Sequence, residues 1–255
     1  MTDDADRKRA SADSFGAATD AYRRSDVHRR GEDLERLARW CRGADVALDV
    51  ATGAGHTAGA IAAAGVPTVV ATDASPEMVA TAVDSFEGVR GAVADAERLP
   101  FSGGAFDAVV CRIAAHHFPN PERFVAETAR VLRSGGTFAL EDNVAPAEPE
   151  LAAFVNRVER LRDPTHVEAH PTSRWREWLE RHGFAVEAVD HLHKPLAFDD
   201  WAAAQSLAGE RRRRVERLLL EAPPEATETF RIRVEDGAVR SFAPRKALIR
   251  ATRRE

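Results

Sequence analysis

The sequence predicts one α/β domain built on a mostly parallel sheet of seven strands, with helices on both faces and an antiparallel hairpin among the last strands. Three observations support this fold class. Short apolar segments alternate with amphipathic ones from about residue 45 to 142. A turn with two glycines joins the first apolar segment to a helix of small residues. An Asp-Gly pair near the end of the chain suits the type I′ turn of a hairpin.

The core elements follow one another in a regular order. Strands are expected at 46–50, 68–72, 89–94, 105–111 and 136–140, where the runs are short and apolar. Helices are expected at 31–42, 56–64, 76–86 and 121–132, where longer stretches intervene. Strands and helices that alternate at this spacing predict βαβ units with right-handed crossovers.

The rest of the chain is less regular. Residues 1–20 are charged and small, so we expect them to be frayed. Helices are expected at 148–162, 172–182 and 199–220, and strands at 184–192, 229–235, 238–242 and 246–251. We therefore expect a single domain over 1–255, with an N-terminal lid segment (1–30), a ligand-binding core (31–142), and insertions and C-terminal strands that shape the rest of the site (143–255).

Composition limits the partners. The 255 residues carry a formal net charge of −5 and are 44% hydrophobic, so a nucleic-acid partner is not expected and a large core is. The basic run Arg211–Arg214 is expected to be a solvated helix face. The first residues are acidic, and no apolar stretch is long enough to insert into a membrane. Cys41 and Cys111 show no paired spacing, so we expect reduced thiols and a cytoplasmic location.

The segment Val46–His56 predicts a ligand site. Gly53 and Gly55 lack the Cβ atoms that would keep a ligand from the backbone, and the helix that follows offers free N–H groups. Asp73 lies twenty residues after Gly53 at a strand end, where a carboxylate can accept hydrogen bonds from ribose hydroxyls. These features are shared by NAD sites and S-adenosylmethionine sites.

Two further carboxylates separate these ligands. Asp49 lies inside the first strand, where NAD-binding sequences usually have an apolar residue and where a carboxylate can receive an ammonium group. Asp95 ends the third strand, where it can accept the exocyclic amine of adenine. Amine, ribose and adenine would each have their own carboxylate, which is the pattern of an S-adenosylmethionine pocket.

The sequence from about 46 to 142 also resembles a known family, the class I S-adenosylmethionine-dependent methyltransferases, and within it the UbiE/YcgJ-like group. Five segments in the same order carry the resemblance: Leu48-Asp-Val-Ala-Thr-Gly-Ala-Gly-His56, Thr72-Asp-Ala-Ser-Pro-Glu-Met78, Asp95-Ala-Glu-Arg-Leu-Pro-Phe101, Cys111-Arg-Ile-Ala-Ala-His-His-Phe118 and Ala129-Arg-Val-Leu-Arg-Ser-Gly-Gly136. Shorter similarities at 22–28, 162–166 and 234–237 extend it over most of the chain. It implies a Rossmann-like fold.

The resemblance also implies roles for individual residues. Gly53 and Gly55 would lie under the methionine moiety, with Asp49 near its amino group and Arg112 near its carboxylate. Asp73 would bind the ribose. The other residues implied in cofactor binding are Ala74 and Met78 on the adenine faces, Asp95 with the Ala96 N–H at the adenine edge, and Tyr22, His28, Ala51 and His117. Met78 is equally well explained as a core residue.

The histidines leave the catalytic group open. One of His116 and His117 is expected to line the site while the other packs against the next helix. If a general base is used, the candidates are His28, His117 and His166. Other histidine pairs, at 166 and 170 and at 191 and 193, do not converge with further ligands, so no metal is expected.

The expected function is methyl transfer from S-adenosylmethionine to a small-molecule acceptor, with S-adenosylhomocysteine as the product. A cofactor-binding regulatory or non-methylating protein of the same fold is one alternative. An NAD-dependent oxidoreductase is another, disfavoured by Asp49 and Asp95 and by the presence of a single tyrosine, Tyr22. The segment with Tyr22, Ser25 and His28 has two interpretations. It forms a lid over the cofactor, or it is a helix that only covers the sheet. The acceptor is not specified by the sequence, and a homodimer is left open.

Overall fold

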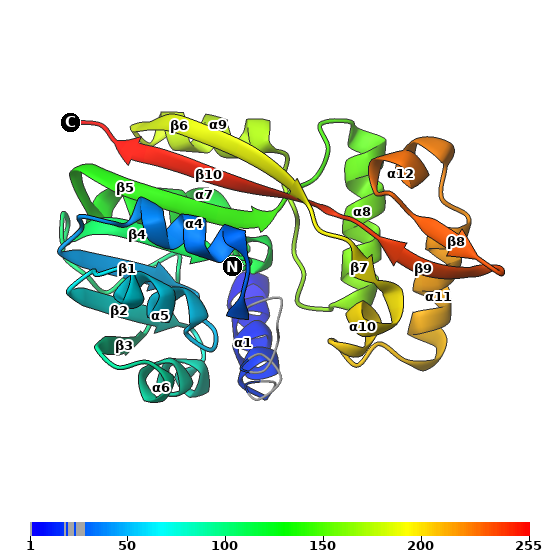
Figure 1. Cartoon of the computed structure of the whole chain (residues 1–255), viewed down its shortest axis with the longest axis horizontal. Helices are drawn as coiled ribbons and strands as arrows, with labels where there is room; N and C mark the ends of the chain where they lie inside the picture. Colours follow the sequence, from blue (N-terminus) through cyan, green and yellow to red (C-terminus); the bar gives the residue numbers. More distant parts are fainter. Residues whose placement is uncertain (1, 18, 20–22, 24–28) are drawn as a thin grey trace.

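The computed structural model describes residues 2–17, 19, 23 and 29–255. Its centre is a seven-stranded sheet with the order β3-β2-β1-β4-β5-β10-β6 (Figure 1). The strands are β1 (Val46–Val50), β2 (Thr68–Asp73), β3 (Val89–Val93), β4 (Phe106–Arg112), β5 (Leu132–Asn143), β6 (Phe184–His193) and β10 (Arg245–Arg253). β10 runs opposite to the other six strands, so its pairings with β5 and β6 are both antiparallel. The predicted α/β class with a mostly parallel sheet is confirmed.

Helices cover both faces of this sheet. One face carries α4 (Glu32–Trp40), α5 (His56–Ala63) and α6 (Pro76–Ser85), and the other carries α7 (Pro121–Val131) and α9 (Thr172–Arg181). Each face buries its own apolar cluster, with Leu37 and Ile61 on the first and Phe124 and Trp175 on the second. Burying large side chains on both faces provides the main stabilisation of such a layered fold.

A smaller lobe lies beyond the carboxyl ends of the parallel strands (Figure 1). It consists of α8 (Pro149–Arg162), α10 (Phe198–Ala203), α11 (Gly209–Leu220), α12 (Pro224–Thr229) and a sheet of β7 (Leu196–Ala197), β9 (Ala238–Phe242) and β8 (Arg233–Glu235). The lobe has its own apolar cluster, which includes Phe198, Trp201 and Phe230. The predicted Asp-Gly hairpin lies in this small sheet, and Asp236 and Gly237 have the positive φ values, 52° and 74°, that a type I′ turn requires.

The prediction that residues 1–20 are frayed is wrong for the described part. Thr2–Ala17 form a helix, α1, which lies across the carboxyl ends of the parallel strands (Figure 1). A short polar helix is marginal by itself, so contacts with the rest of the protein decide whether it forms. Those contacts include ion pairs from Lys8 to the end of β3.

Two further boundaries differ from the sequence prediction. The single helix expected at 199–220 is two helices, α10 and α11, because the chain turns at Ser206 (φ 50°) and Gly209 (φ 58°) and buries Leu207 between them. The strand expected at 229–235 begins only at Arg233, because Pro224–Thr229 form α12 with proline in its first turn.

Candidate active site

The glycine turn connects β1 to α5 and forms one wall of a pocket. The Thr52 N–H donates to the Thr72 carbonyl at 2.8 Å and the Gly55 N–H donates to the Thr52 carbonyl at 3.0 Å, which closes the turn. Both glycines have positive φ, 54° at Gly53 and 87° at Gly55. A Cβ on Gly53 would meet no atom within 4 Å, whereas one on Gly55 would lie 2.7 Å from the Ala82 backbone. Gly53 therefore leaves space in the pocket, and Gly55 allows α5 and α6 to pack together.

Asp73 ends β2 and holds this turn in place. Its Oδ2 accepts from the Gly53 N–H at 3.0 Å and its Oδ1 accepts from the Ser75 N–H at 3.0 Å. Burial raises the pKa of Asp73, and the backbone N–H groups oppose that shift. Each carboxylate oxygen has two lone pairs, so both can still accept a ribose hydroxyl.

Asp49 lies beneath the turn rather than in the pocket wall. Its side chain is buried, and Oδ2 accepts from the Thr52 hydroxyl at 2.6 Å. Among the described residues no group makes a hydrogen bond to Oδ1. Burial raises the pKa of Asp49 to about 7, although the Thr52 hydroxyl and the Ala58 N–H in the first turn of α5 both lower it. A buried carboxylate with a free oxygen is suited to receive a cationic group.

Arg112 ends β4 between two buried carboxylates. Its Nε donates to Glu141 Oε2 at 2.7 Å and its Nη2 donates to Asp33 Oδ2 at 2.8 Å. Burial alone would lower the pKa of Arg112, but Glu141 and Asp33 raise it. Arg112 lines the pocket, yet two of its nitrogen atoms are occupied by protein carboxylates.

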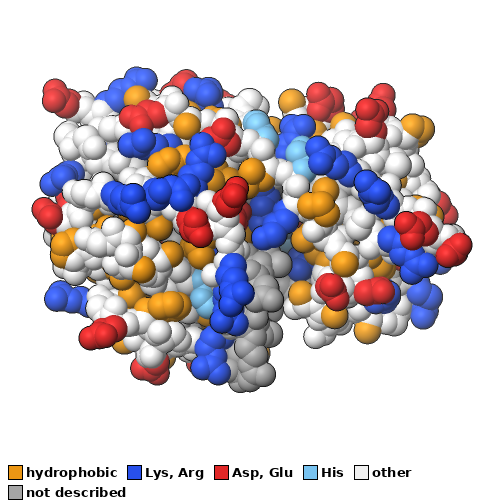
Figure 2. Space-filling view, in the orientation of Figure 1, with side chains coloured by type: hydrophobic (Ala, Val, Ile, Leu, Met, Phe, Trp, Pro, Cys, Tyr) orange, Lys and Arg blue, Asp and Glu red, His pale blue; other side chains and the backbone are white. Residues whose placement is uncertain are grey.

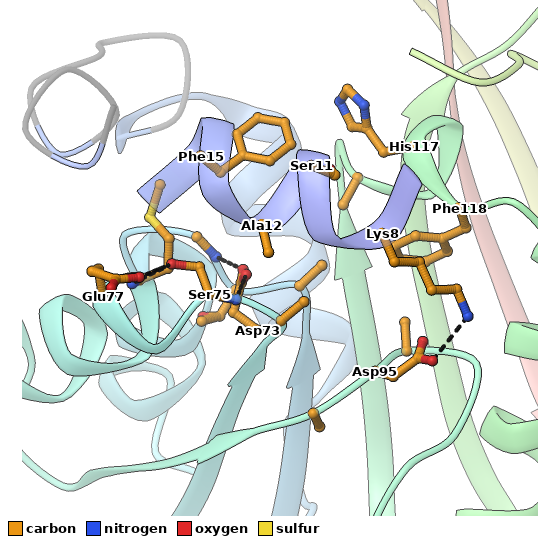
Figure 3. Close-up of a pocket in the computed structure, with 18 of the residues that line it drawn as sticks. Lys8, Ser11, Ala12, Phe15, Asp73, Ser75, Glu77, Asp95, His117 and Phe118 are labelled. Atoms are coloured by element: carbon orange, nitrogen blue, oxygen red, sulfur yellow. Dashed lines mark hydrogen bonds and ion pairs between the residues drawn. The ribbon is translucent and has the colours of Figure 1, made fainter. Parts of the chain in front are cut away.

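Asp95 and Glu97 follow β3 and share one cation. Lys8 Nζ donates to Asp95 Oδ2 at 2.8 Å and to Glu97 Oε2 at 2.6 Å. Asp95 Oδ1 accepts from the Glu97 N–H at 2.9 Å. Figure 3 shows Lys8 pointing from α1 toward Asp95 at the edge of the pocket.

The two adjacent histidines of η1 (Ala115–His117) have different surroundings. His116 is buried, and its Nδ1 lies 2.6 Å from Asp142 Oδ1; burial opposes protonation, but Asp142 raises its pKa. His117 lines the pocket, and burial together with the positive charge on His116 lowers its pKa to about 4. The structure therefore places His117, not His116, at the pocket.

The orientation of His117 is fixed from outside the pocket. Its Nδ1 lies 3.1 Å from both the Thr165 carbonyl oxygen and the Thr165 hydroxyl. A carbonyl only accepts, so Nδ1 carries the proton and Nε2 carries the lone pair. The Thr165 hydroxyl donates to Asp163 Oδ1 at 2.6 Å, and this bond holds Thr165 in the position that orients the His117 ring.

The pocket has a volume of about 560 Å³, which is the size of a small-molecule site. Of the residues predicted to bind the cofactor, those that line it are Ala51, Gly53, Asp73, Ala74, Met78, Asp95, Ala96, Arg112 and His117. Asp49 and Gly55 lie behind the lining. His166 is buried away from it, with Nε2 donating to Asn156 Oδ1 at 2.8 Å. Tyr22, Ser25 and His28, the predicted lid, lie outside the described residues.

The sequence prediction missed the contribution of α1 to this pocket. Lys8, Ser11, Ala12 and Phe15 all line it, and Phe15 lies edge-on to His117 with ring centroids 4.9 Å apart (Figure 3). Their spacing of i, i+3, i+4 and i+7 places them on one helical face. That spacing indicates a helix, but three of the four residues are polar or small, so the sequence shows no apolar stripe there.

The pocket fits S-adenosylmethionine on its own geometry. Asp73 suits a diol, and the open space at Gly53 lets a ligand approach the backbone, with the Asp49 carboxylate buried behind the turn. Among the described residues, no three His, Cys, Asp or Glu side chains converge on a common point that could hold a metal ion.

Comparison with known proteins agrees with this geometry. A family model described as a methyltransferase domain matches residues 48–140. The uncharacterized methyltransferase YcgJ of Bacillus subtilis is 36% identical over 249 residues, which are 94% of this chain and 98% of that protein. Its crystal structure is 35% identical and has a TM-score of 0.84, covering 88% of this chain and 98% of its own.

Fold and pocket together define a class I S-adenosylmethionine-dependent methyltransferase. The chain belongs to the methyltransferase family of YcgJ. A more distant structure, the geranyl diphosphate C-methyltransferase of Streptomyces coelicolor with bound S-adenosyl-L-homocysteine, is 16% identical, has a TM-score of 0.60 and covers 86% of this chain and 78% of its own. That likeness concerns the fold. The protein is an enzyme that transfers a methyl group from S-adenosylmethionine.

Proposed function

We propose that S-adenosylmethionine lies along the 560 Å³ pocket and that its methyl group passes to a hydroxyl of a small molecule. Support for the cofactor position comes from the order of the lining residues. Asp95 and Ala96 stand at the end of β3 for adenine, Asp73 at the end of β2 for ribose, and Gly53 beside β1 for the methionine part. Ligands of open α/β sheets bind at this carboxyl edge.

On this proposal, individual residues take finer roles. Asp49 would pair with the amino group from below the turn, and Arg112, which lines the pocket, would lie near the methionine carboxylate. Ala51, Ala74 and Met78 would pack against the cofactor. Gly55 would act indirectly by fixing the turn. Tyr22 and His28 retain their proposed contact with the cofactor from the segment between α1 and α4.

The proposal of a hydroxyl acceptor rests on the tautomer and the neutral charge of the His117 ring. Its Nδ1–H is held by Thr165, so a lone pair on Nε2 is left for the pocket, and its pKa of about 4 keeps it neutral at physiological pH. A thiolate or a neutral amine attacks without such help, whereas a hydroxyl must lose its proton.

Bound S-adenosylmethionine supplies an electrophilic methyl group whose S–C electron pair stays on sulfur as the acceptor oxygen forms the new C–O bond. The oxygen turns into a strong acid as that bond forms, so a weak base is sufficient to take its proton. His117 accepts that proton at Nε2. Phe15 and Phe118, which also line the pocket, exclude water around the reacting atoms.

Small acceptors are favoured over nucleic acid. Figure 2 shows basic and acidic side chains interspersed over one face of the molecule. Arg211 donates to the carbonyls of Leu161 and Arg162, and Arg212 pairs with Asp199. Part of the basic run therefore holds α8 and α10 instead of facing a polyanion. No helix in the described ranges is long and apolar enough to cross a membrane. We place the enzyme in the cytoplasm, and a homodimer is compatible with this proposal.

An acceptor screen tests the proposed function. Purified enzyme with S-adenosylmethionine is offered alcohols, phenols, thiols and amines, and release of S-adenosylhomocysteine is measured. We expect release with one or more hydroxyl compounds. Release with amines or thiols alone would contradict the proposed acceptor class.

Replacing His117 with phenylalanine is expected to lower kcat about 100-fold with the hydroxyl acceptor, because a positioned base contributes on the order of 10²-fold or more. The acceptor KM should change much less. The comparison variant is His166→Gln, which keeps a donor for Asn156 and should retain kcat within about threefold. If the variant at His166 lost activity and the variant at His117 kept it, His166 would be the base instead. Between pH 5 and 8 the wild-type kcat should not change through titration of His117, since the pKa of that histidine is about 4.

A further inference from the structure

Helix α1 forms the outer wall of the pocket. Figure 3 shows it crossing above Asp73 and Asp95, with Lys8 at one end of the crossing and Phe15 at the other. The α1 residues that line the pocket are Lys8, Arg9, Ser11, Ala12, Asp13 and Phe15. A ligand seated at the glycine turn would thus be covered by this helix.

Lys8 makes the charged attachment of α1 to the core. Its ammonium contacts both Asp95 and Glu97, at 2.8 and 2.6 Å. Glu97 is buried, with 3% of its surface exposed, and it also accepts from the Asn120 N–H at 2.7 Å and from Asn120 Nδ2 at 3.2 Å. Asn120 Nδ2 in turn reaches Asp4 Oδ2 on α1 at 3.2 Å. The first half of α1 is therefore tied to the loops after β3 and η1.

The second half of α1 is held by close packing. A Cβ on Gly16 would lie 2.9 Å from Glu77 Oε2 and 3.0 Å from Ser75 Oγ, so α1 approaches the start of α6 closely here. Phe15, the residue directly before Gly16, contacts His117. The helix is thus held on both sides of the pocket, by ion pairs at Lys8 and by close packing at Gly16 and Phe15.

The charge of Lys8 also matters for the two acids themselves. Asp95 and Glu97 contact the same ammonium, so without it two like charges would face each other, one of them buried. The two carboxylates would then move apart. That movement would take Asp95 away from the orientation in which it can read the adenine amine.

We propose that Lys8 is a positioning residue for the cofactor: it fastens α1 over the pocket and holds Asp95 ready for adenine. This inference rests on the proposed cofactor position. Asp95 Oδ2 retains a lone pair beside the Lys8 contact, so adenine and Lys8 can be bound at the same time. Cofactor and closed α1 then stabilise each other, and the cofactor leaves when the Lys8 contacts break.

Binding of S-adenosylhomocysteine tests this role without any acceptor. Lys8→Gln should raise Kd about tenfold, mainly through a faster dissociation rate measured by stopped flow or surface plasmon resonance. Lys8→Arg retains the charge and two donors, so it should stay within about threefold of wild type. Arg213→Gln, an equal charge change at an exposed position of α11, is the control and should leave Kd unchanged.

Limited trypsin digestion followed by mass spectrometry gives a second readout. In the wild type, S-adenosylhomocysteine should slow cleavage after Arg7 and Arg9 several-fold. In Lys8→Gln that protection should be lost, although the fold gives the same circular dichroism spectrum. Equal Kd, dissociation rate and protection in Lys8→Gln and Arg213→Gln would overturn the inference. Failure of the wild type to bind S-adenosylhomocysteine would instead overturn the proposed cofactor position.

Discussion

Replacing Gly55 with alanine is expected to destabilise the fold by about 4 kcal/mol, because the residue meets two separate obstacles. Its φ of 87° is left-handed, which costs an L-residue roughly 1–2 kcal/mol. Its new methyl group would also lie 2.7 Å from Ala82 Cα and Cβ and 3.1 Å from the Phe86 ring. Overpacking of this kind costs about 1–3 kcal/mol. Backbone atoms cannot rotate away as a side chain can, so α5 and α6 must move apart.

Gly53→Ala is the matched control for this change. It has a similarly positive φ of 54°, but its methyl group would meet no atom within 4 Å. Urea unfolding should show a loss of only about 1 kcal/mol for Gly53→Ala. Its effect should appear in S-adenosylmethionine affinity, because the methyl group occupies pocket space. Equal loss of stability in the two variants would show that backbone strain alone explains both glycines.

The parts of the site that lie on the parallel strands followed directly from the sequence. Asp73 and Asp95 each come at the end of a short apolar run, and parallel strands bring such ends to one edge. The turn at Gly53 could be predicted because a positive φ beside a ligand needs glycine. The cofactor class followed from these three positions together with Asp49.

Other parts depend on contacts between distant segments. Helix α1 has no apolar stripe, so its position on the pocket depends on Lys8 meeting Asp95 and Glu97, more than eighty residues away. Which of His116 and His117 faces the pocket depends on Asp142 and Thr165, which come from other segments. The break between α10 and α11 depends on burial of Leu207 in the small lobe. Local patterns carry none of this information.

Asp49 is expected to favour cofactor binding at the expense of stability. Its pKa in the folded protein is about 7, above its ordinary value of 3.8. Between those values the folded state keeps a proton that the unfolded state has lost, so stability falls as pH rises from about 4 to about 7 and then levels off. At pH 8 the buried charge opposes folding by at most about 4 kcal/mol.

Asp49→Asn removes that charge while conserving the side-chain shape. The amide adds a buried donor that lacks a partner, which reduces the stabilisation obtained by removing the charge. We therefore expect the free enzyme to be about 2 kcal/mol more stable at pH 8. Its unfolding free energy should also lose the part of the pH dependence between 4 and 7 that Asp49 contributes, while the buried Asp73 and Glu141, whose pKa values are also raised, keep theirs. Denaturant unfolding across this pH range measures both effects.

Cofactor affinity should change in the opposite direction. The ionised form of Asp49 pairs with the cofactor ammonium on the proposed function, so Asp49→Asn should weaken S-adenosylmethionine binding about 100-fold, or close to 3 kcal/mol. In the wild type, affinity should rise from pH 6 to 8, and calorimetry in buffers of different ionisation enthalpy should detect proton release on binding. A more stable variant with unchanged affinity would mean that the ammonium is bound elsewhere. Loss of both stability and affinity would mean instead that Asp49 is needed to build the turn.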